Sequence, residues 1–463
     1  MSRVTADYKS ERFEMSKRNK SGLWRAGVAF VVAFVFTVGL LPAGAPDSSA
    51  QVAAPQRPPV ATVNPRSASV AAATAEVLKE TGEIRKLEVR RAVKSGAQSR
   101  AEIERMLVRN LDEQTTPAEL HAGELALKKL GLVPADFKMR PFMIELLTEQ
   151  VAGYYDPKTQ EFYLADWIDL DGQQPVIAHE LTHALQDQHF NLRRFEDWPK
   201  GDSDAEIAAH ALVEGDATLV MTFYVMRDLK RVAAMMKSMN AAGSASEKIE
   251  RAPRVLRESL LFPYKQGMEW ASHVYRRGGW PLVSEAYNKL PQSTEQILHA
   301  EKYFANEAPV KIDLPEIGGL LGKGWARLDY DVNGEWGYFQ ILDEYLRAEK
   351  ESQTAAGGWG GDRFALYEKR ATREVLLAQL TVWDTERDAA EFFDAYVKRT
   401  ERRYKAAVAD TRASVPVETR RVWRTTGEGA VVMERQGARV AILEGVPEKA
   451  DASALLKKVM GTL

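Results

Sequence analysis

The chain has 463 residues, of which 63 are lysine or arginine and 65 are acidic, so its formal net charge is −2. This balance provides no strong electrostatic attraction to nucleic acid, and we expect no nucleic-acid partner. The chain contains no cysteine, which excludes disulfide bonds, thiol catalysis and acylation of a lipoprotein cysteine.

Residues 1–50 have the pattern of a secretory signal peptide. Basic residues precede an apolar run from Ala26 to Leu41, and residues 48–50 are small, as a cleavage site requires. We therefore predict a secreted or periplasmic protein. The apolar run is short for a membrane span, so we expect membrane contact only if this segment stays uncleaved as an anchor.

Residues 51–80 are rich in alanine, proline and valine, which predicts a disordered linker. Helix-start signals follow. Ser99 and Glu102 have the spacing of a capping box, Pro117 begins a second helix, and Pro134 or Pro141 begins a third. These signals predict a mostly helical body.

Residues 154–164 have the pattern of strand, turn and strand. Tyr154 and Tyr155 precede Asp156-Pro157, a pair that favours the start of a turn, and the run Phe162-Tyr163-Leu164 follows it. The segment therefore predicts a β-hairpin just before the most informative motif of the chain.

That motif is His179-Glu180-Leu181-Thr182-His183. Residues four apart on a helix lie on one face with about 5–6 Å between their Cβ atoms, so both imidazoles can reach one Zn²⁺ ion. Glu180 lies about 100° around the helix, close to a metal-bound water without being a ligand, where it can act as general base. Pro175 near the helix start and an apolar stripe through Ile177, Leu181 and Leu185 support a helix here.

A catalytic zinc site needs a third protein ligand, and two residues compete for this role. His189 lies ten positions after His179, but the loop that would return it to the metal needs a glycine where the chain has Gln186. We therefore expect the helix to continue and His189 to point away. Glu214 is the stronger candidate.

Glu214 lies in a predicted helix over residues 204–230, within an apolar stripe. A carboxylate in such a stripe is costly unless it is paired with a cation or bound to a metal. Gly215 and Ala217 are small, which would let this helix approach the one with the histidines. Asp216 falls on the opposite face, where we expect it to be solvated. An ordinary ion pair with arginine or lysine is the alternative role for Glu214.

Together, the HExxH motif and Glu214-Gly215-Asp216-Ala217 resemble the gluzincin branch of zinc metallopeptidases. The chain also resembles exported bacterial proteins that share the strings at residues 153–157, 179–188 and 293–299. The resemblance implies a zincin-like metallopeptidase domain over residues 81–352, with Zn²⁺ held by His179, His183 and Glu214 and with Glu180 as general base. A protein or peptide would be the substrate.

The resemblance also implies a histidine or tyrosine, supplied after the third ligand, that stabilises the oxyanion. His299 is our first candidate, in a helix opened by Ser293 and Gln296; Tyr264 and His210 are weaker ones. The edge strand of the hairpin over residues 154–164 would pair with an extended substrate, although a hairpin that belongs only to the core fits the same pattern.

A second unit is predicted over residues 358–463, after a glycine-rich joint at residues 355–361. We predict strands at 363–369, 375–383, 430–435 and 438–444 and helices at 385–403 and 451–459. The fold class is therefore α+β: a mostly helical domain with a small sheet, followed by a smaller α+β domain. The second unit contains no histidine, so we do not expect it to hold the metal.

The sequence thus predicts an exported zinc metallopeptidase that cleaves peptide bonds. A catalytically silent envelope protein for binding or assembly is the alternative, although structural zinc needs no base such as Glu180. A hydrolase that acts on cell-wall peptides is a third reading. Nothing in the sequence indicates an oligomeric state.

Overall fold

The computed structural model describes residues 65–167, 173–196, 198–241, 251–406, 420–424 and 426–461. The predicted signal peptide and residues 51–64 of the predicted linker lie outside these ranges. No helix in the described ranges combines the length and the apolar character needed to cross a membrane.

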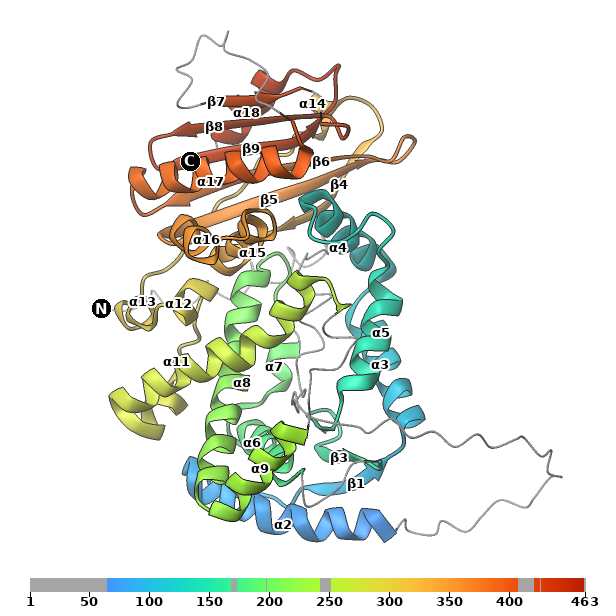
Figure 1. Cartoon of the computed structure of the whole chain (residues 1–463), viewed down its shortest axis with the longest axis vertical. Helices are drawn as coiled ribbons and strands as arrows, with labels where there is room; N and C mark the ends of the chain where they lie inside the picture. The colour runs from blue at the N-terminus through green and yellow to red at the C-terminus, as the bar shows by residue number, and fades with distance from the viewer. Residues whose placement is uncertain are drawn as a thin grey trace, which may run out of the picture.

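The fold is α+β, with a helical N-terminal part and a C-terminal part built on a sheet (Figure 1). The helices of the N-terminal part are α2 (Pro65–Arg85), α3 (Arg100–Gln114), α4 (Pro117–Leu130), α5 (Met139–Gln150), α6 (Gln174–Phe190), α7 (Arg193–Glu196), α8 (Ser203–Met226), α9 (Leu229–Ala241), α11 (Arg254–Ala286), α12 (Thr294–Leu298) and α13 (Ala300–Ala305). Several of them begin where the sequence predicts: Ser99 and Glu102 form the capping box of α3, and Pro117 opens α4.

A small sheet lies beside α6. The predicted hairpin is confirmed as β2 (Gly153–Asp156) and β3 (Glu161–Ala165), which pair antiparallel. Strand β1 (Lys94–Gln98) pairs parallel with β3, so the order is β1-β3-β2 and β2 is an edge strand of the described sheet.

The C-terminal sheet is antiparallel, in the order β4-β5-β6-β9-β8-β7. Its strands are β4 (Trp325–Asp331), β5 (Trp359–Lys369), β6 (Glu374–Trp383), β7 (Arg420–Trp423), β8 (Ala430–Gln436) and β9 (Arg439–Val446). The helices of this part are α14 (Gly318–Leu321), α15 (Gly334–Leu346), α16 (Glu349–Ala356), α17 (Glu386–Tyr404) and α18 (Ala452–Met460).

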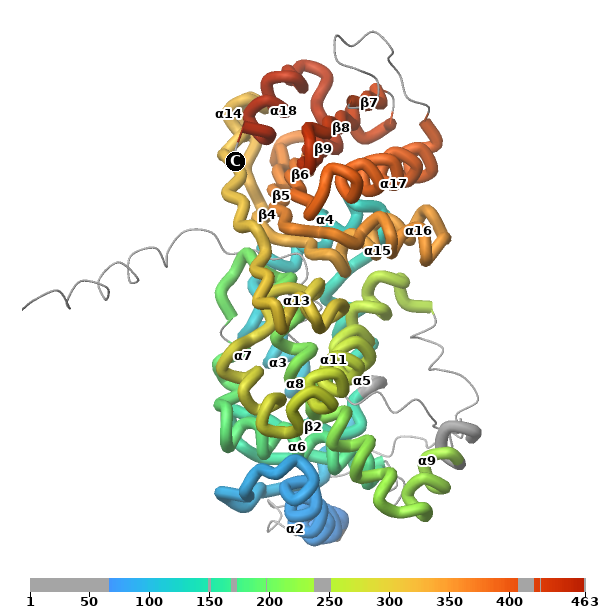
Figure 2. The backbone as a smooth tube through the Cα atoms, turned by 90° about the vertical axis from the view of Figure 1, so that its left-hand side faces the viewer, coloured from blue at the N-terminus to red at the C-terminus, as the bar shows by residue number. Residues whose placement is uncertain are grey.

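Both faces of this sheet are covered, and alternate residues of its strands therefore pack in two different cores. On one face, Phe364 and Leu366 pack in the core that includes Phe392 of α17. On the other face, Ala365 and Tyr367 pack in a second core with α18. Figure 2 shows α17 and α18 on opposite sides of the sheet. The first core continues without a break into the N-terminal helices, so the two parts share one interior.

The predicted linker over residues 51–80 is wrong for its second half. Residues 65–80 belong to α2, whose Val70, Val77 and Leu78 are buried. Alanine-rich composition resembles a mobile tether, but alanine is also the best helix former and Pro65 suits a first helical turn.

The sheet also begins earlier than the predicted second unit. Strand β4 precedes the glycine-rich joint and pairs with β5, so the unit built on the sheet includes residues well before 358. The predicted strands and helices after the joint are present as β5, β6, β8, β9, α17 and α18.

Helices α8 and α11 cross at a very short distance. A Cβ atom added to Gly215 of α8 would collide with the backbone of Gly267 in α11, and one added to Gly267 would collide with the backbone of Ala211. The glycine at position 215 therefore does permit a close approach between helices, but the partner is α11 and not the histidine helix α6.

Candidate metal centre

Helix α6 holds the two predicted imidazoles against each other. Pro175 lies in its first turn, and the helix continues through Gln186 to Phe190, as the sequence predicts. The Nε2 atoms of His179 and His183 lie 3.0 Å apart, and the two rings are nearly perpendicular, at 83°. Both side chains are buried.

Helix α8 brings Glu214 to the same point. Its Oε2 lies 3.0 Å from Nε2 of His179 and 3.4 Å from Nε2 of His183. With ligand distances of about 2.0–2.1 Å, two ligand atoms on tetrahedral zinc lie about 3.3 Å apart. The three atoms therefore have the spacing that one zinc ion requires, and the buried carboxylate has no lysine or arginine partner in the described part of the chain.

The orientation of His183 is determined by Gln186, one turn further along α6. The amide nitrogen of Gln186 donates to the carbonyl of Val213 and to Asp216, so its Oε1 must accept from Nδ1 of His183, at 2.8 Å. This assignment leaves Nε2 of His183 as the atom that faces His179 and Glu214. A second residue that orients a ligand imidazole in this way is a common feature of metal sites.

Asp216 anchors this arrangement and is not solvated as predicted. It is fully buried and accepts hydrogen bonds from Nε of Arg85 at 2.6 Å and from the hydroxyl of Tyr287 at 2.9 Å, in addition to the one from Gln186. Its face of α8 is covered by α2 and by the end of α11. The burial of Asp216 could not be predicted from the sequence, because Arg85 and Tyr287 are distant from it in the chain.

Glu180 lies at the junction of α6 and the small sheet. Its Oε2 accepts a hydrogen bond of 2.9 Å from the backbone N–H of Tyr155 in β2. Its Oε1 is buried and makes no hydrogen bond to the described residues. Burial raises the pKa of Glu180 to about 8, which is suited to proton transfer near neutral pH.

The pKa values of the three candidate ligands shift in different directions. Burial lowers the pKa of His179. Burial also acts to lower the pKa of His183, but the adjacent Glu214 carboxylate outweighs this and raises it to about 9. Burial acts to raise the pKa of Glu214, but the two imidazoles lower it to about 2. At neutral pH these shifts favour an ionised Glu214 beside a protonated His183.

Tyr264 lies beside this cluster. Its ring centroid is 5.9 Å from that of His179, and its side chain is partly buried. Tyr264 precedes Gly267 by one turn of α11, so the close crossing with Gly215 carries it toward Glu214 and His179. Of the sequence candidates for the oxyanion donor, Tyr264 is thus one whose ring lies beside His179.

His299 does not join the cluster. It ends the short helix α12, and its Nε2 lies 2.9 Å from Glu335 Oε1 of α15, with 39% of the side chain exposed. The predicted position in a helix opened by Ser293 is present, but that helix packs at the start of α8, where Asp204 bonds to Thr294. Glu214 lies ten residues further along, about 15 Å by the rise of an α-helix.

The other histidines that we considered also lie outside the group of three. Nε2 of His189 bonds to the backbone carbonyl of Glu88 at 2.8 Å, away from the cluster. His210 is buried in α8, one turn before Glu214, but is not among the converging ligand atoms. A second acidic group, Glu295, Glu307 and Asp384, surrounds the ammonium of Lys302, which accounts for it.

Comparison with known proteins reaches only the C-terminal part. Residues 323–456 match a family described as a domain of unknown function, DUF8575. The match begins just before β4 and ends within α18, so it covers the large sheet and none of the candidate ligands. No curated protein and no solved structure matches the chain.

We expect zinc binding to release protons. Because His183 has a pKa of about 9, it carries a proton at neutral pH that a metal must displace. Affinity should therefore rise with pH up to about pH 9, roughly tenfold per pH unit for each proton displaced. Calorimetric titration at pH 7 in two buffers of different ionisation enthalpy would count the protons. An affinity that is constant between pH 6 and 8 would contradict this charge assignment.

We expect Gln186→Met to weaken zinc binding by about 10–100-fold, because His183 loses the acceptor that orients its ring. Competition with a fluorescent chelator measures the affinity. Gln188→Met is the matched control, since the amide of Gln188 contacts the backbone of Arg90 and Arg91 and no histidine. Equal losses in the two variants would indicate a general effect on α6.

Proposed function

We propose that this chain is an exported zinc metallopeptidase, with His179, His183 and Glu214 as the zinc ligands. The observation that supports this most directly is the convergence of three buried ligand atoms from α6 and α8, spaced 3.0–3.4 Å apart. The HExxH motif adds a carboxylate, Glu180, that a purely structural zinc site does not need.

Zinc, when bound, supplies a Lewis acid that polarises the substrate carbonyl and a water of lowered pKa. Glu180 is the proposed general base. The water oxygen bonds to the carbonyl carbon of the scissile peptide, and Glu180 accepts the proton that the water loses. The carbon–nitrogen bond then breaks, and Glu180 returns this proton to the departing amine nitrogen.

Tyr264 is the proposed donor to the oxyanion that forms on the substrate carbonyl. It replaces His299 in this role, because its ring adjoins His179 whereas His299 pairs with Glu335. A phenol hydroxyl directed at developing negative charge acts as an oxyanion-hole donor.

The alternative is a binding or assembly protein in which the metal serves only structure. One observation favours it: the side chains of His179, Glu180, His183 and Glu214 are all at most 1% exposed. A peptide must reach these groups for catalysis, so the proposed activity requires the site to open when substrate binds. Product analysis and metal analysis together separate the two roles.

We expect Glu180→Gln to retain zinc and to lose peptide hydrolysis by about 10³-fold or more, because the amide cannot accept the proton. The mature chain and the variant are compared for zinc content by elemental analysis and for activity on casein and on peptidoglycan fragments. The substrate that is cleaved distinguishes a general peptidase from an enzyme of the cell wall. Two proteins with equal zinc and no hydrolysis by either would support the structural role instead.

We expect Tyr264→Phe to lower kcat by about 10²-fold with little change in KM, because the hydroxyl would act on the oxyanion rather than on the bound substrate. His299→Gln should leave both constants unchanged. Steady-state kinetics on the substrate found above tests both variants. The reverse pattern, with loss in His299→Gln only, would restore His299 as the oxyanion donor.

A further inference from the structure

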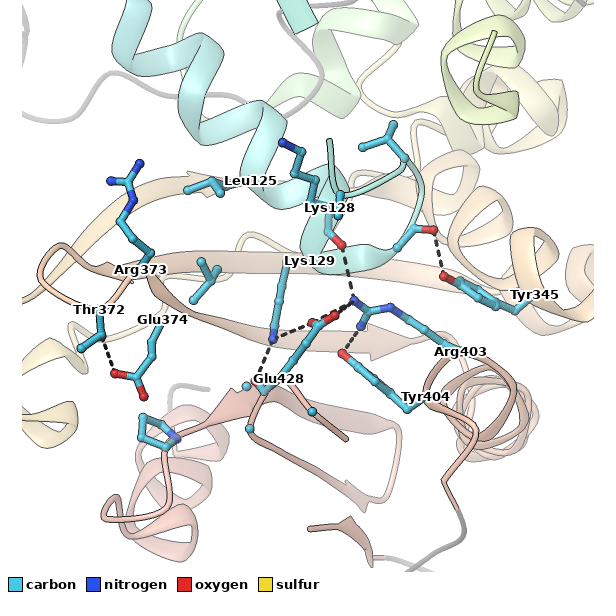
Figure 3. Close-up of a pocket in the computed structure, with 18 residues that line it drawn as sticks. Leu125, Lys128, Lys129, Tyr345, Thr372, Arg373, Glu374, Arg403, Tyr404 and Glu428 are labelled. Atoms are coloured by element: carbon cyan, nitrogen blue, oxygen red, sulfur yellow. Dashed lines mark hydrogen bonds and ion pairs between the residues drawn. The ribbon is translucent and has the colours of Figure 1, made fainter. Parts of the chain in front are cut away.

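A second site lies far from the candidate ligands, where α4 meets the C-terminal sheet. The cavity has a volume of about 630 Å³, which suits a small organic ligand. Its lining comes from α4, α15, α17 and β6 and from the glycine-rich turn before β8 (Figure 3). The lining includes basic side chains, two tyrosines and apolar residues such as Leu125, Val133 and Val375.

Two buried cations meet in this pocket. Lys129 of α4 and Arg403 of α17 have side chains that are only 5% and 4% exposed. Both point at the carboxylate of Glu428, as Figure 3 shows. Nζ of Lys129 lies 3.2 Å from Oε2 of Glu428, and a terminal nitrogen of Arg403 lies 3.1 Å from the same oxygen.

The buried charges around this point do not balance without Glu428. Behind the pocket, Arg399 and Arg403 each donate to the buried carboxylate of Glu444 at 2.8 Å. Glu444 is the one fully buried anion among the described partners of three cations, Lys129, Arg399 and Arg403. Burial lowers the pKa of Lys129 and the two glutamates counteract this, so a further anion stabilises its ammonium form.

Glu428 is much more exposed than the two cations, Lys129 and Arg403, that it pairs with. Its side chain is 47% exposed. Glu428 lies in the turn before β8, between Gly427 and Gly429, which have φ angles of 80° and 93°. The carboxylate can therefore rotate into water without disturbing the core. Behind it, a Cβ atom at Gly445 would collide first with the backbone carbonyl of Val375 and then with Nζ of Lys129, so the backbone and the ammonium both pack closely against this glycine.

The geometry points to a binding site for an organic carboxylate, whose head group replaces that of Glu428 between Lys129 and Arg403. Its apolar part would contact the aliphatic side chains and Tyr345 in the lining. Glu428 then acts as an internal competitor that occupies the head-group position when the ligand is absent. The free end of a peptide and a simple fatty acid share this chemistry, and the test distinguishes them. The inference does not rest on the metal centre.

The probes are N-acetyl-leucyl-leucine, its C-terminal amide and hexanoate, each titrated calorimetrically into the full chain at constant ionic strength. We expect both carboxylates, but not the amide, to bind. Glu428→Gln should bind them about tenfold more tightly than the wild type, because the competing carboxylate is gone. Glu428→Asp, with a shorter reach, should lie between the two. The tighter of the two carboxylates identifies the source as peptide or fatty acid.

Glu374→Gln is the matched control, since Glu374 also lines the pocket but bonds to Thr372 and Lys369 instead of the two buried cations. It should bind like the wild type. Lys129→Met should abolish binding; thermal denaturation establishes whether this variant folds, and the Glu428 variants test the site independently of it. Equal binding of the amide, or no gain in affinity in folded Glu428→Gln, would overturn the proposal.

Discussion

The arrangement of the candidate metal centre depends on the hydrogen bonds of one buried carboxylate, that of Asp216. It joins Arg85 of α2, Tyr287 after α11 and Gln186 of α6 to its own helix α8. Through Gln186 it determines which nitrogen of His183 faces Glu214. Removal of one partner from a buried ion pair typically costs about 3–5 kcal/mol, because the other charge stays in the protein interior. Arg85 therefore supports the candidate site through Asp216 and Gln186, without contacting a candidate ligand.

Local signals in the sequence were enough for much of the fold. Pro175, the capping box at Ser99 and the Asp156-Pro157 turn between two aromatic runs each act within a few residues, and they predict α6, α3 and the hairpin β2–β3. The composition of α2 suits both a disordered linker and a helix. Packing of its apolar residues in the core, which the sequence does not reveal, favours the helix. Strand β4 was missed because its partner β5 lies beyond two intervening helices.

The residues of the candidate site also fall into two groups, those that a local sequence pattern predicts and those that depend on helix packing. His179, Glu180 and His183 belong to one helical motif, and Glu214 could be predicted because a carboxylate in an apolar stripe calls for a partner. Gln186 stands three residues after His183 on the same face, a signal that could have identified it. Tyr264 and Asp216 depend on how α11 and α2 cross α8, which no local pattern reveals. For the same reason, the family resemblance and the helix start at Ser293 point to His299, although the packing of α12 places it beside Glu335.

The family match begins at residue 323, yet Lys129 and Leu125 come from α4, nearly two hundred residues upstream. A fragment that starts at that boundary would lack α4, which packs against β4 and β6, and Glu428 would keep Arg403 but lose the ammonium of Lys129. The pocket therefore extends beyond the residues that the family match covers, and a chain limited to those residues would lack the α4 part of its wall.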